Sequence, residues 1–281
     1  MILTHLKMLA EFTKVRIAAM ATLTAAVGYA LSPGMGNIGF GWMLAGVFLL
    51  ACGAGALNQV QERAIDALMP RTRNRPLPTG RMTTMQGRVV AVGLILLGLV
   101  MLLPSTTVVM LGAATVMSYN GVYTWLKRVS RFAAIPGGVV GALPPVIGYA
   151  AGGGSVFDPA IVAVAVFFFV WQVPHYWILL LRFGDEYELA GLPTLTSVLS
   201  RRQLARLTWM WMIATGVVCM TLPVYIESHV GILVGLLGAT FWVIRAATVM
   251  LRSGGDVLVF REINLYALMV MSLISINGLV G

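Results

Sequence analysis

Charged residues are scarce in this sequence of 281 residues. Asp, Glu, Lys and Arg together make up 10% of the chain, whereas a soluble domain carries roughly a quarter. Hydrophobic residues make up 59%. A protein surface with so little charge could not stay wetted, so the sequence predicts that lipid solvates most of the chain.

The sequence also lacks the alternation of apolar and polar residues that membrane β-barrels need. Its apolar runs are long and continuous, so the predicted class is an all-α polytopic membrane protein, folded as one domain over residues 1–281. The only cysteines, Cys52 and Cys219, lie in apolar runs and are predicted to be small core residues. No cleavable signal peptide is expected, because the first apolar run continues as a membrane span.

Apolar runs of about 20 residues predict nine membrane-spanning helices. They lie near residues 17–32, 41–61, 88–104, 106–126, 133–151, 159–181, 207–226, 230–250 and 263–280. All 19 Lys and Arg residues fall at the N-terminus or in alternate connections between these spans, and the opposite connections carry none. This pattern explains the net charge of +9 by membrane topology and speaks against a nucleic-acid partner.

The charge pattern predicts a multi-pass protein of a prokaryotic cytoplasmic (inner) membrane. The N-terminus and the long basic loops are expected in the cytoplasm, and the C-terminus outside. The short connections on the opposite side look like simple turns, so chemistry is expected on the cytoplasmic side.

Three polar residues follow one face of the second predicted span where it ends. Asn58, Glu62 and Asp66 are spaced four residues apart, so on a helix they lie in one row. Carboxylate and amide oxygens suit Mg²⁺, which usually joins one or two carboxylates to substrate phosphates. The alternative is a solvated helix end, with the acids paired to Arg63 or Arg71.

An arginine-rich loop follows this row. Arg71, Arg73 and Arg75 could bind a polyanion, because guanidinium forks match phosphate oxygens. The alternative is ordinary anchoring on the positive side of the membrane, and at least one of the three is expected to do only that.

A second polar cluster begins inside the sixth span. Gln172 and His175 lie at membrane depth beside Pro174, where a kink is expected and where polar groups usually serve function. His175, Arg182 and Glu186 would share a face if the helix continues past residue 184. A hydrogen bond between helices is the alternative for His175.

The acidic residues Asp185, Glu186 and Glu188 follow this segment and are candidates for the opposing metal ligands. Of the three, Glu188 is the one most readily explained as solvated. In the fifth span, Pro144-Pro145 is expected to allow a break.

The fourth span ends in a third candidate group. Tyr119 and Tyr123 are predicted to face the interior of the bundle, and Lys127 or Arg128 could reach the same phosphates. The alternative for the two cations is snorkelling at a helix end. Two acidic clusters with interleaved cations on one side of the membrane suggest a Mg²⁺–diphosphate site, with an apolar tail among the helices and an aromatic pocket for an allyl cation.

At this point the motifs resemble the UbiA superfamily of intramembrane prenyltransferases, and within it the protohaem IX farnesyltransferase branch. In the first polar cluster, the resemblance is carried by Asn58-x3-Glu62-x3-Asp66 and by Met69-x-Arg71-Thr72-x-Asn74-Arg75-Pro76. In the second polar cluster, it is carried by Trp171-Gln172-x-Pro174-His175, Glu186-Tyr187 and Ala190-Gly191-x-Pro193. In the fifth span, it is carried by Gly141-Ala142-x-Pro144-Pro145. Departures from the branch are Glu62 in place of Asp, Asp185-Glu186-Tyr187 in place of Lys-Asp-Tyr, and Thr194-Leu195-Thr196 in place of Met/Val-Leu-Pro.

The resemblance implies a fold of two four-helix units plus a ninth helix around a central cavity. It implies transfer of a farnesyl group from farnesyl diphosphate to a vinyl group of haem B, with Mg²⁺ as cofactor. Asn58, Glu62, Asp66 and Asp185 or Glu186 would then hold the metal, and Arg71, Arg75, Lys127 and Arg128 the diphosphate.

His175 would then orient the haem, and a haem A synthase or an oxidase-assembly protein is a candidate partner. Two other functions stay open. One is a polyprenyltransferase acting on 4-hydroxybenzoate or another aromatic ring, and the other is a membrane transporter.

Overall fold

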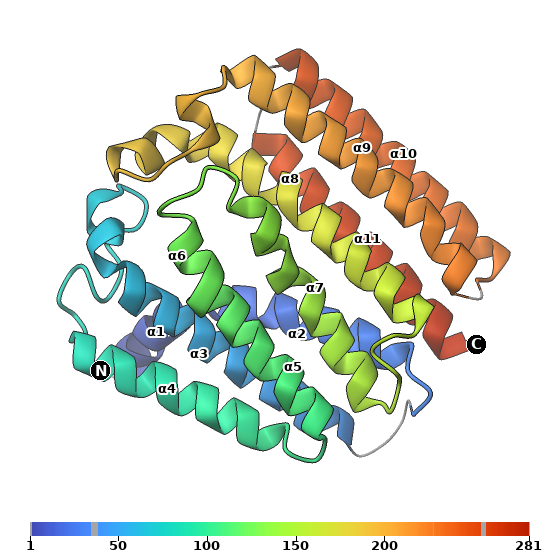
Figure 1. The fold of residues 1–281 in the computed structure, drawn as a ribbon, viewed down its shortest axis with the longest axis horizontal. Coiled ribbons are helices and arrows are strands. Elements are labelled where there is room, and N and C mark those ends of the chain that lie inside the picture. The colour runs from blue at the N-terminus through green and yellow to red at the C-terminus, as the bar shows by residue number, and fades with distance from the viewer. Residues whose placement is uncertain (1, 35–38, 227, 254–256, 281) are drawn as a thin grey trace.

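The computed structural model describes residues 2–34, 39–226, 228–253 and 257–280, and every regular element in these ranges is a helix (Figure 1). The first part contains α1 (Ile2–Phe12), α2 (Val15–Ala30), α3 (Gly39–Leu68), α4 (Thr84–Met101), α5 (Thr106–Val116), the π-helix η1 (Met117–Tyr123) and α6 (Thr124–Leu126). The second part contains α7 (Ala134–Ala151), α8 (Pro159–Leu189), the 3₁₀-helix η2 (Leu195–Ser197), α9 (Arg201–Tyr225), α10 (Val230–Ser253) and α11 (Val257–Val280).

The predicted spans all fall on helices, which confirms a polytopic all-α membrane protein. Within the described ranges, seven helices are long and apolar enough to cross a membrane. The two other predicted spans differ, because α2 has only 16 residues and the fourth span is divided into α5, η1 and α6. The count of nine spans is therefore not confirmed.

Local sequence signals account for where several helices begin. Thr83 and Gln86 form a reciprocal capping box at the start of α4, and Ser200 and Gln203 form another at the start of α9. The carboxylate of Asp158 accepts a hydrogen bond from the backbone N–H of Ala160 at 2.8 Å and so caps α8. These caps satisfy N–H groups that the first helical turn leaves without partners.

The helices lie side by side, with α3 along α4, α2 along α7, α7 along α8 and α8 along α9 (Figure 1). Glycines permit the closest approach, between α2 and α7. A Cβ atom on Gly28 would lie 1.8 Å from the carbonyl oxygen of Pro145, and one on Gly148 would lie 1.8 Å from that of Ala25. Small residues at such crossings are typical of membrane helices.

The expected break in α7 is wrong, and the departure from helical geometry in α8 lies at another residue than the proline. Helix α7 runs from Ala134 to Ala151 through Pro144 and Pro145 without a break. Helix α8 remains helical at Pro174, and its backbone departs from helical values at Phe183 instead, with φ −121° and ψ 15°. Residues after Phe183 therefore do not continue the helical face on which His175 lies.

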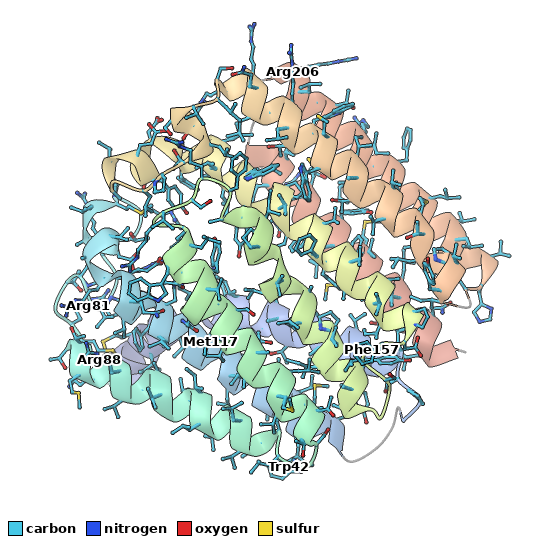
Figure 2. The ribbon with its side chains drawn as sticks, viewed as in Figure 1. Trp42, Arg81, Arg88, Met117, Phe157 and Arg206 are labelled. Carbon is cyan, nitrogen blue, oxygen red and sulfur yellow. The ribbon has the colours of Figure 1, made fainter. Side chains whose placement is uncertain are left out.

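The basic residues gather at one end of the bundle. In Figure 2 the labelled Arg81, Arg88 and Arg206 lie along the upper-left edge, whereas Trp42 and Phe157 lie toward the opposite edge. Two surface hollows of about 470 and 370 Å³ lie at that opposite end, lined by residues such as Trp42 and Phe157. None of the predicted site residues lines either hollow.

Candidate functional site

The polar row on α3 is buried in protein. Asn58, Glu62 and Asp66 are 2%, 5% and 3% exposed, and α3 continues past all three to Leu68. The alternative of a solvated helix end is therefore wrong. Buried charges are costly unless they are paired, so their partners define the site.

Each of the three side chains meets a cation from a different part of the chain. Arg75 donates from one nitrogen to both carboxylate oxygens of Asp66, at 2.8 Å each. Lys127, at the end of α6, forms an ion pair with Glu62. Neither acid is paired with Arg63 or Arg71: Arg63 is exposed and contacts Thr84 instead.

The third cation is Lys14, which the sequence analysis counted only as a topology signal. Its Nζ donates to Oδ1 of Asn58 at 2.7 Å and lies 3.5 Å from the hydroxyl of Tyr119. Burial lowers the pKa of Lys14 to about 7, with the nearby Arg75 adding to the shift and Glu62 opposing it. A basic pair, Lys14 and Arg16, at the start of an apolar helix was the signal available in the sequence.

The π-helix η1 places an aromatic row beside the cations. The rings of Tyr119 and Tyr123 stack with centroids 6.1 Å apart, and Tyr176 of α8 stacks on Tyr123 at 5.6 Å. Lys127 Nζ lies 5.9 Å from the ring centre of Tyr123. A π-helix has about one more residue per turn than an α-helix, so side chains four residues apart lie closer to one line along the helix. Tyr176, which follows His175 in the second cluster, was not among the predicted site residues, although it completes this row.

Amide side chains attach this π-helix to α3. Asn120 donates to the carbonyl of Ala54 at 3.0 Å and to Oε1 of Gln61 at 3.1 Å, and Gln61 donates back to the carbonyl of Asn120 at 3.0 Å. Arg128, a predicted phosphate ligand, donates to the carbonyl of Gln61 at 2.7 Å and stacks over Trp125. In this structure Arg128 thus contributes to holding α3.

The second acidic cluster meets the first through the arginine loop. The backbone N–H of Arg71 donates to Glu186 at 3.2 Å, and its guanidinium donates to the hydroxyl of Tyr187 at 3.2 Å. Tyr187 is also within electrostatic range of Glu62 and Arg75. The structure therefore brings the two clusters together, as predicted.

The remaining residues of these segments point elsewhere. Asp185 and Arg73 are exposed. Glu188 accepts hydrogen bonds from the hydroxyls of Thr194 at 3.0 Å and Thr196 at 2.5 Å, so the two threonines that depart from the branch pattern hold this acid. Of the three acids, Glu186 is the one that contacts the arginine loop next to α3.

His175 lies on another side of α8. Its ring packs against Trp171 at 4.9 Å and against Phe260 of α11 at 5.0 Å, and Trp171 donates to the carbonyl of Ile263 at 2.9 Å. The predicted shared face of His175, Arg182 and Glu186 is wrong, because the backbone departs from the helix at residue 183 and Arg182 is exposed.

Gln172, one turn before Tyr176, packs over Gly141 of α7, where a Cβ atom would lie 2.5 Å from Oε1 of Gln172. A side chain at position 141 would therefore displace this amide. Gln172 also lies beside the hydroxyl of Tyr176, so it belongs to the aromatic wall next to η1.

The donor set suits a metal that is shared with a substrate. Among the described residues, no three His, Cys, Asp or Glu side chains are grouped closely enough to hold a metal ion alone. Asn58, Glu62, Asp66 and Glu186 nevertheless offer hard oxygen atoms, each beside a different cationic residue. Mg²⁺ characteristically combines one or two carboxylates with phosphate oxygens, so these residues fit Mg²⁺ bound together with a diphosphate.

Fold and site together define a helical membrane protein with a buried, cation-rich polar site at one end and an aromatic wall beside it. Such a site suits a molecule with a polyanionic head and an apolar body. A model of the UbiA prenyltransferase family matches residues 21–261. The chain belongs to this family.

Named relatives and solved structures agree with this assignment. A protoheme IX farnesyltransferase of Oleidesulfovibrio alaskensis is 38% identical over 270 residues, which cover 94% of each chain. The apo structure of a UbiA homologue from Aeropyrum pernix K1 has a TM-score of 0.76 at 18% identity and covers 95% of this chain and 98% of its own. A UbiA homologue from Archaeoglobus fulgidus, bound to GPP and Mg²⁺, has a TM-score of 0.68 at 14% identity, with 97% and 98% covered.

Proposed function

We propose that this protein transfers the farnesyl group of farnesyl diphosphate to a vinyl group of haem B with addition of water, giving haem O and diphosphate. The observation that carries the proposal is the buried row of Asn58, Glu62 and Asp66, each held by a separate cation. The name and 38% identity of the relative from Oleidesulfovibrio alaskensis support the choice of substrates.

The α3 row and Glu186 are proposed to hold Mg²⁺ once the diphosphate is present. The bound ion would neutralise charge on the departing diphosphate. Arg75, Lys127 and Lys14 would turn from the side chains that they now contact toward phosphate oxygens, because a diphosphate supplies more negative charge than one carboxylate. Arg71 would add a fourth cation from the loop.

The aromatic row is proposed to face the farnesyl group where its bond to oxygen breaks. As that bond breaks, the electron pair leaves with the diphosphate and positive charge develops on the allyl carbons. The π faces of Tyr119, Tyr123 and Tyr176 stabilise such a charge, more strongly where water is excluded. The terminal carbon of the acceptor's vinyl group then supplies the electron pair for the new carbon–carbon bond, which leaves a positive charge on the vinyl carbon next to the porphyrin. A water molecule adds to that carbon and loses a proton, which gives the hydroxyl group of haem O.

The acceptor is proposed to lie along α8, on the side of Gln172 and His175. Trp171, His175 and Phe260 form an aromatic surface between α8 and α11 that a flat macrocycle could contact. Because Tyr176 borders both His175 and Tyr123, this surface adjoins the aromatic row. His175 would orient the haem.

Two alternatives make different predictions. A polyprenyltransferase would modify 4-hydroxybenzoate or another aromatic ring and leave haem unchanged. A transporter would move its substrate without any Mg²⁺ requirement. Asp66→Ala would then abolish the flux of that substrate. The wild-type protein would show no Mg²⁺-dependent binding of diphosphate.

The direct test uses purified protein in lipid nanodiscs with Mg²⁺, farnesyl diphosphate and haem B. Mass spectrometry of the extracted haem should show the farnesylated product, and none without Mg²⁺. A parallel reaction with 4-hydroxybenzoate is the matched control. If that phenol is prenylated and haem is not, the acceptor proposal is wrong and the prenyl-transfer proposal stands.

The multi-pass fold is clear, and its setting is part of the proposal. The protein would lie in a prokaryotic inner membrane, with the basic end and the site in the cytoplasm and the C-terminus outside. A haem A synthase or an oxidase-assembly protein would be the partner that takes the product.

A further inference from the structure

A glutamine that faces away from the metal row has an unusual set of contacts. Gln59 follows Asn58 directly on α3 and is 1% exposed. Its Nε2 donates to the last two backbone carbonyls of α1, at 3.0 Å to Glu11 and 2.9 Å to Phe12, directly before the turn that joins α1 to α2. A buried amide used in this way fixes the turn relative to α3.

The turn that Gln59 holds ends in Lys14, whose backbone is strained. Lys14 is the only non-glycine residue with positive φ in the described ranges, at φ 53° and ψ 44°. This left-handed conformation is unfavourable for a residue with a side chain, so the surrounding contacts must maintain it. It directs the side chain back to α3, where Nζ reaches Asn58.

Close packing supports the same turn. A Cβ atom on Gly55 would lie 3.2 Å from the carbonyl oxygen of Thr13 and 3.6 Å from Cβ of Lys14, so α3 and the turn touch at this glycine. Phe12 is fully buried beneath α1, next to Val60 and Met82. Gln59 and Gly55 thus hold the turn from one face of α3, and the buried ring of Phe12 anchors the end of α1 beside it.

We propose that Gln59 is a positioning residue that holds Lys14 in its left-handed conformation, so that the ammonium group is already in place for the diphosphate. The inference rests on the proposed function, in which Lys14 binds that group. Within the described ranges, the side-chain hydrogen bonds of Gln59 go only to Glu11 and Phe12, so its effect would reach the substrate through Lys14.

A double-mutant cycle on pyrophosphate binding, measured by calorimetry in nanodiscs with Mg²⁺, tests the proposal. Lys14→Met should weaken binding about 30-fold, because it removes a charged hydrogen bond. Gln59→Met should weaken binding about tenfold. In the Lys14→Met background, Gln59→Met should cause less than a twofold further loss, because its effect acts through Lys14.

Two further variants keep the test decisive. Gly55→Ala adds a methyl group against the same turn without removing a hydrogen bond. It should weaken pyrophosphate binding about threefold when Lys14 is present, and not in the Lys14→Met background. Gln203→Met removes a glutamine from the exposed capping box of α9 and should leave pyrophosphate binding unchanged. If Gln59→Met does not fold, Gly55→Ala carries the cycle.

Additive losses, or no loss from Gln59→Met, would overturn the role of Gln59 while leaving the proposed function intact. If wild-type protein binds no pyrophosphate with Mg²⁺, the proposed function fails and this inference fails with it. The two failures are therefore distinguishable in one experiment.

Discussion

The acidic ends of α3 and α8 carry similar residue types but have different environments. On α3, Glu62 and Asp66 are almost fully buried, and each faces a cation. On α8, Asp185 and Glu188 are exposed, and Glu186 accepts a hydrogen bond from the backbone of Arg71. In the proposed function, α3 would therefore supply the charge recognition, whereas α8 would supply part of an aromatic wall and one acid at its margin.

The backbone explains this difference. Helix α3 keeps its helical period to Leu68, so residues four apart remain in one row. Helix α8 departs from helical geometry at Phe183, whose ring lies 5.1 Å from the guanidinium carbon of Arg71 and 4.8 Å from that of Arg182. The acids beyond this point are rotated out of line with His175 and Tyr176.

The largest expected effect is on α3. Asp66→Asn should lower farnesyl transfer at least about 100-fold, because it removes one partner of a buried ion pair and a proposed metal ligand. Turnover of purified protein measures the effect, with thermal unfolding to verify that the variant folds. Asp185→Asn is the matched control on α8 and should remain within about twofold of wild type. Equal losses in both variants would contradict the difference between the two ends.

A second prediction concerns metal binding in the absence of substrate. Lys127→Met frees the carboxylate of Glu62, so Mn²⁺ should bind about tenfold more tightly without pyrophosphate, and Mn²⁺–pyrophosphate should bind more weakly. The electron paramagnetic resonance signal of free Mn²⁺ measures both affinities.

Arg63→Met is the control for this experiment, because Arg63 lies on α3 next to Glu62 but is exposed and contacts Thr84. It should change neither affinity. Unchanged Mn²⁺ binding in Lys127→Met would show that Lys127 does not compete with the metal for Glu62.

A smaller effect is expected at the end of α8. Glu186→Gln should lower turnover about fivefold, because the amide oxygen can still accept from Arg71 while the charge is lost. Steady-state kinetics at several Mg²⁺ concentrations should show that excess Mg²⁺ partly restores the rate. If Asp185→Asn causes the larger and Mg²⁺-sensitive loss, then Asp185 is the acid that faces the metal.

The smallest effect separates the arginines of the loop. Arg73→Gln should change the affinity for pyrophosphate by less than about twofold, because Arg73 is exposed. Arg75→Gln should weaken it at least about tenfold, since Arg75 is half-buried against Asp66. Titration calorimetry compares the two. Similar losses would mean that the loop acts through its total charge and not through individual contacts.

Much of the molecule could be predicted from local pattern. Apolar run length indicated where helices lie, and the four-residue spacing of Asn58, Glu62 and Asp66 correctly predicted a common face. The break in α8 could not be predicted in this way, because proline was the visible signal and the departure occurs at Phe183. The contact of Lys14 with Asn58 was also not predicted, since basic residues before a span are what membrane topology alone would produce.

The sequence by itself determined the membrane class, the helical segments, the gathering of basic residues at one end and the polar row on α3. These depend on composition and on the period of a single helix, which is local information. Only the tertiary structure decided which cation meets which oxygen, such as Lys14 with Asn58, 44 residues away. The period of a helix sets the direction of a side chain, whereas the packing of other helices against that face sets what the side chain contacts.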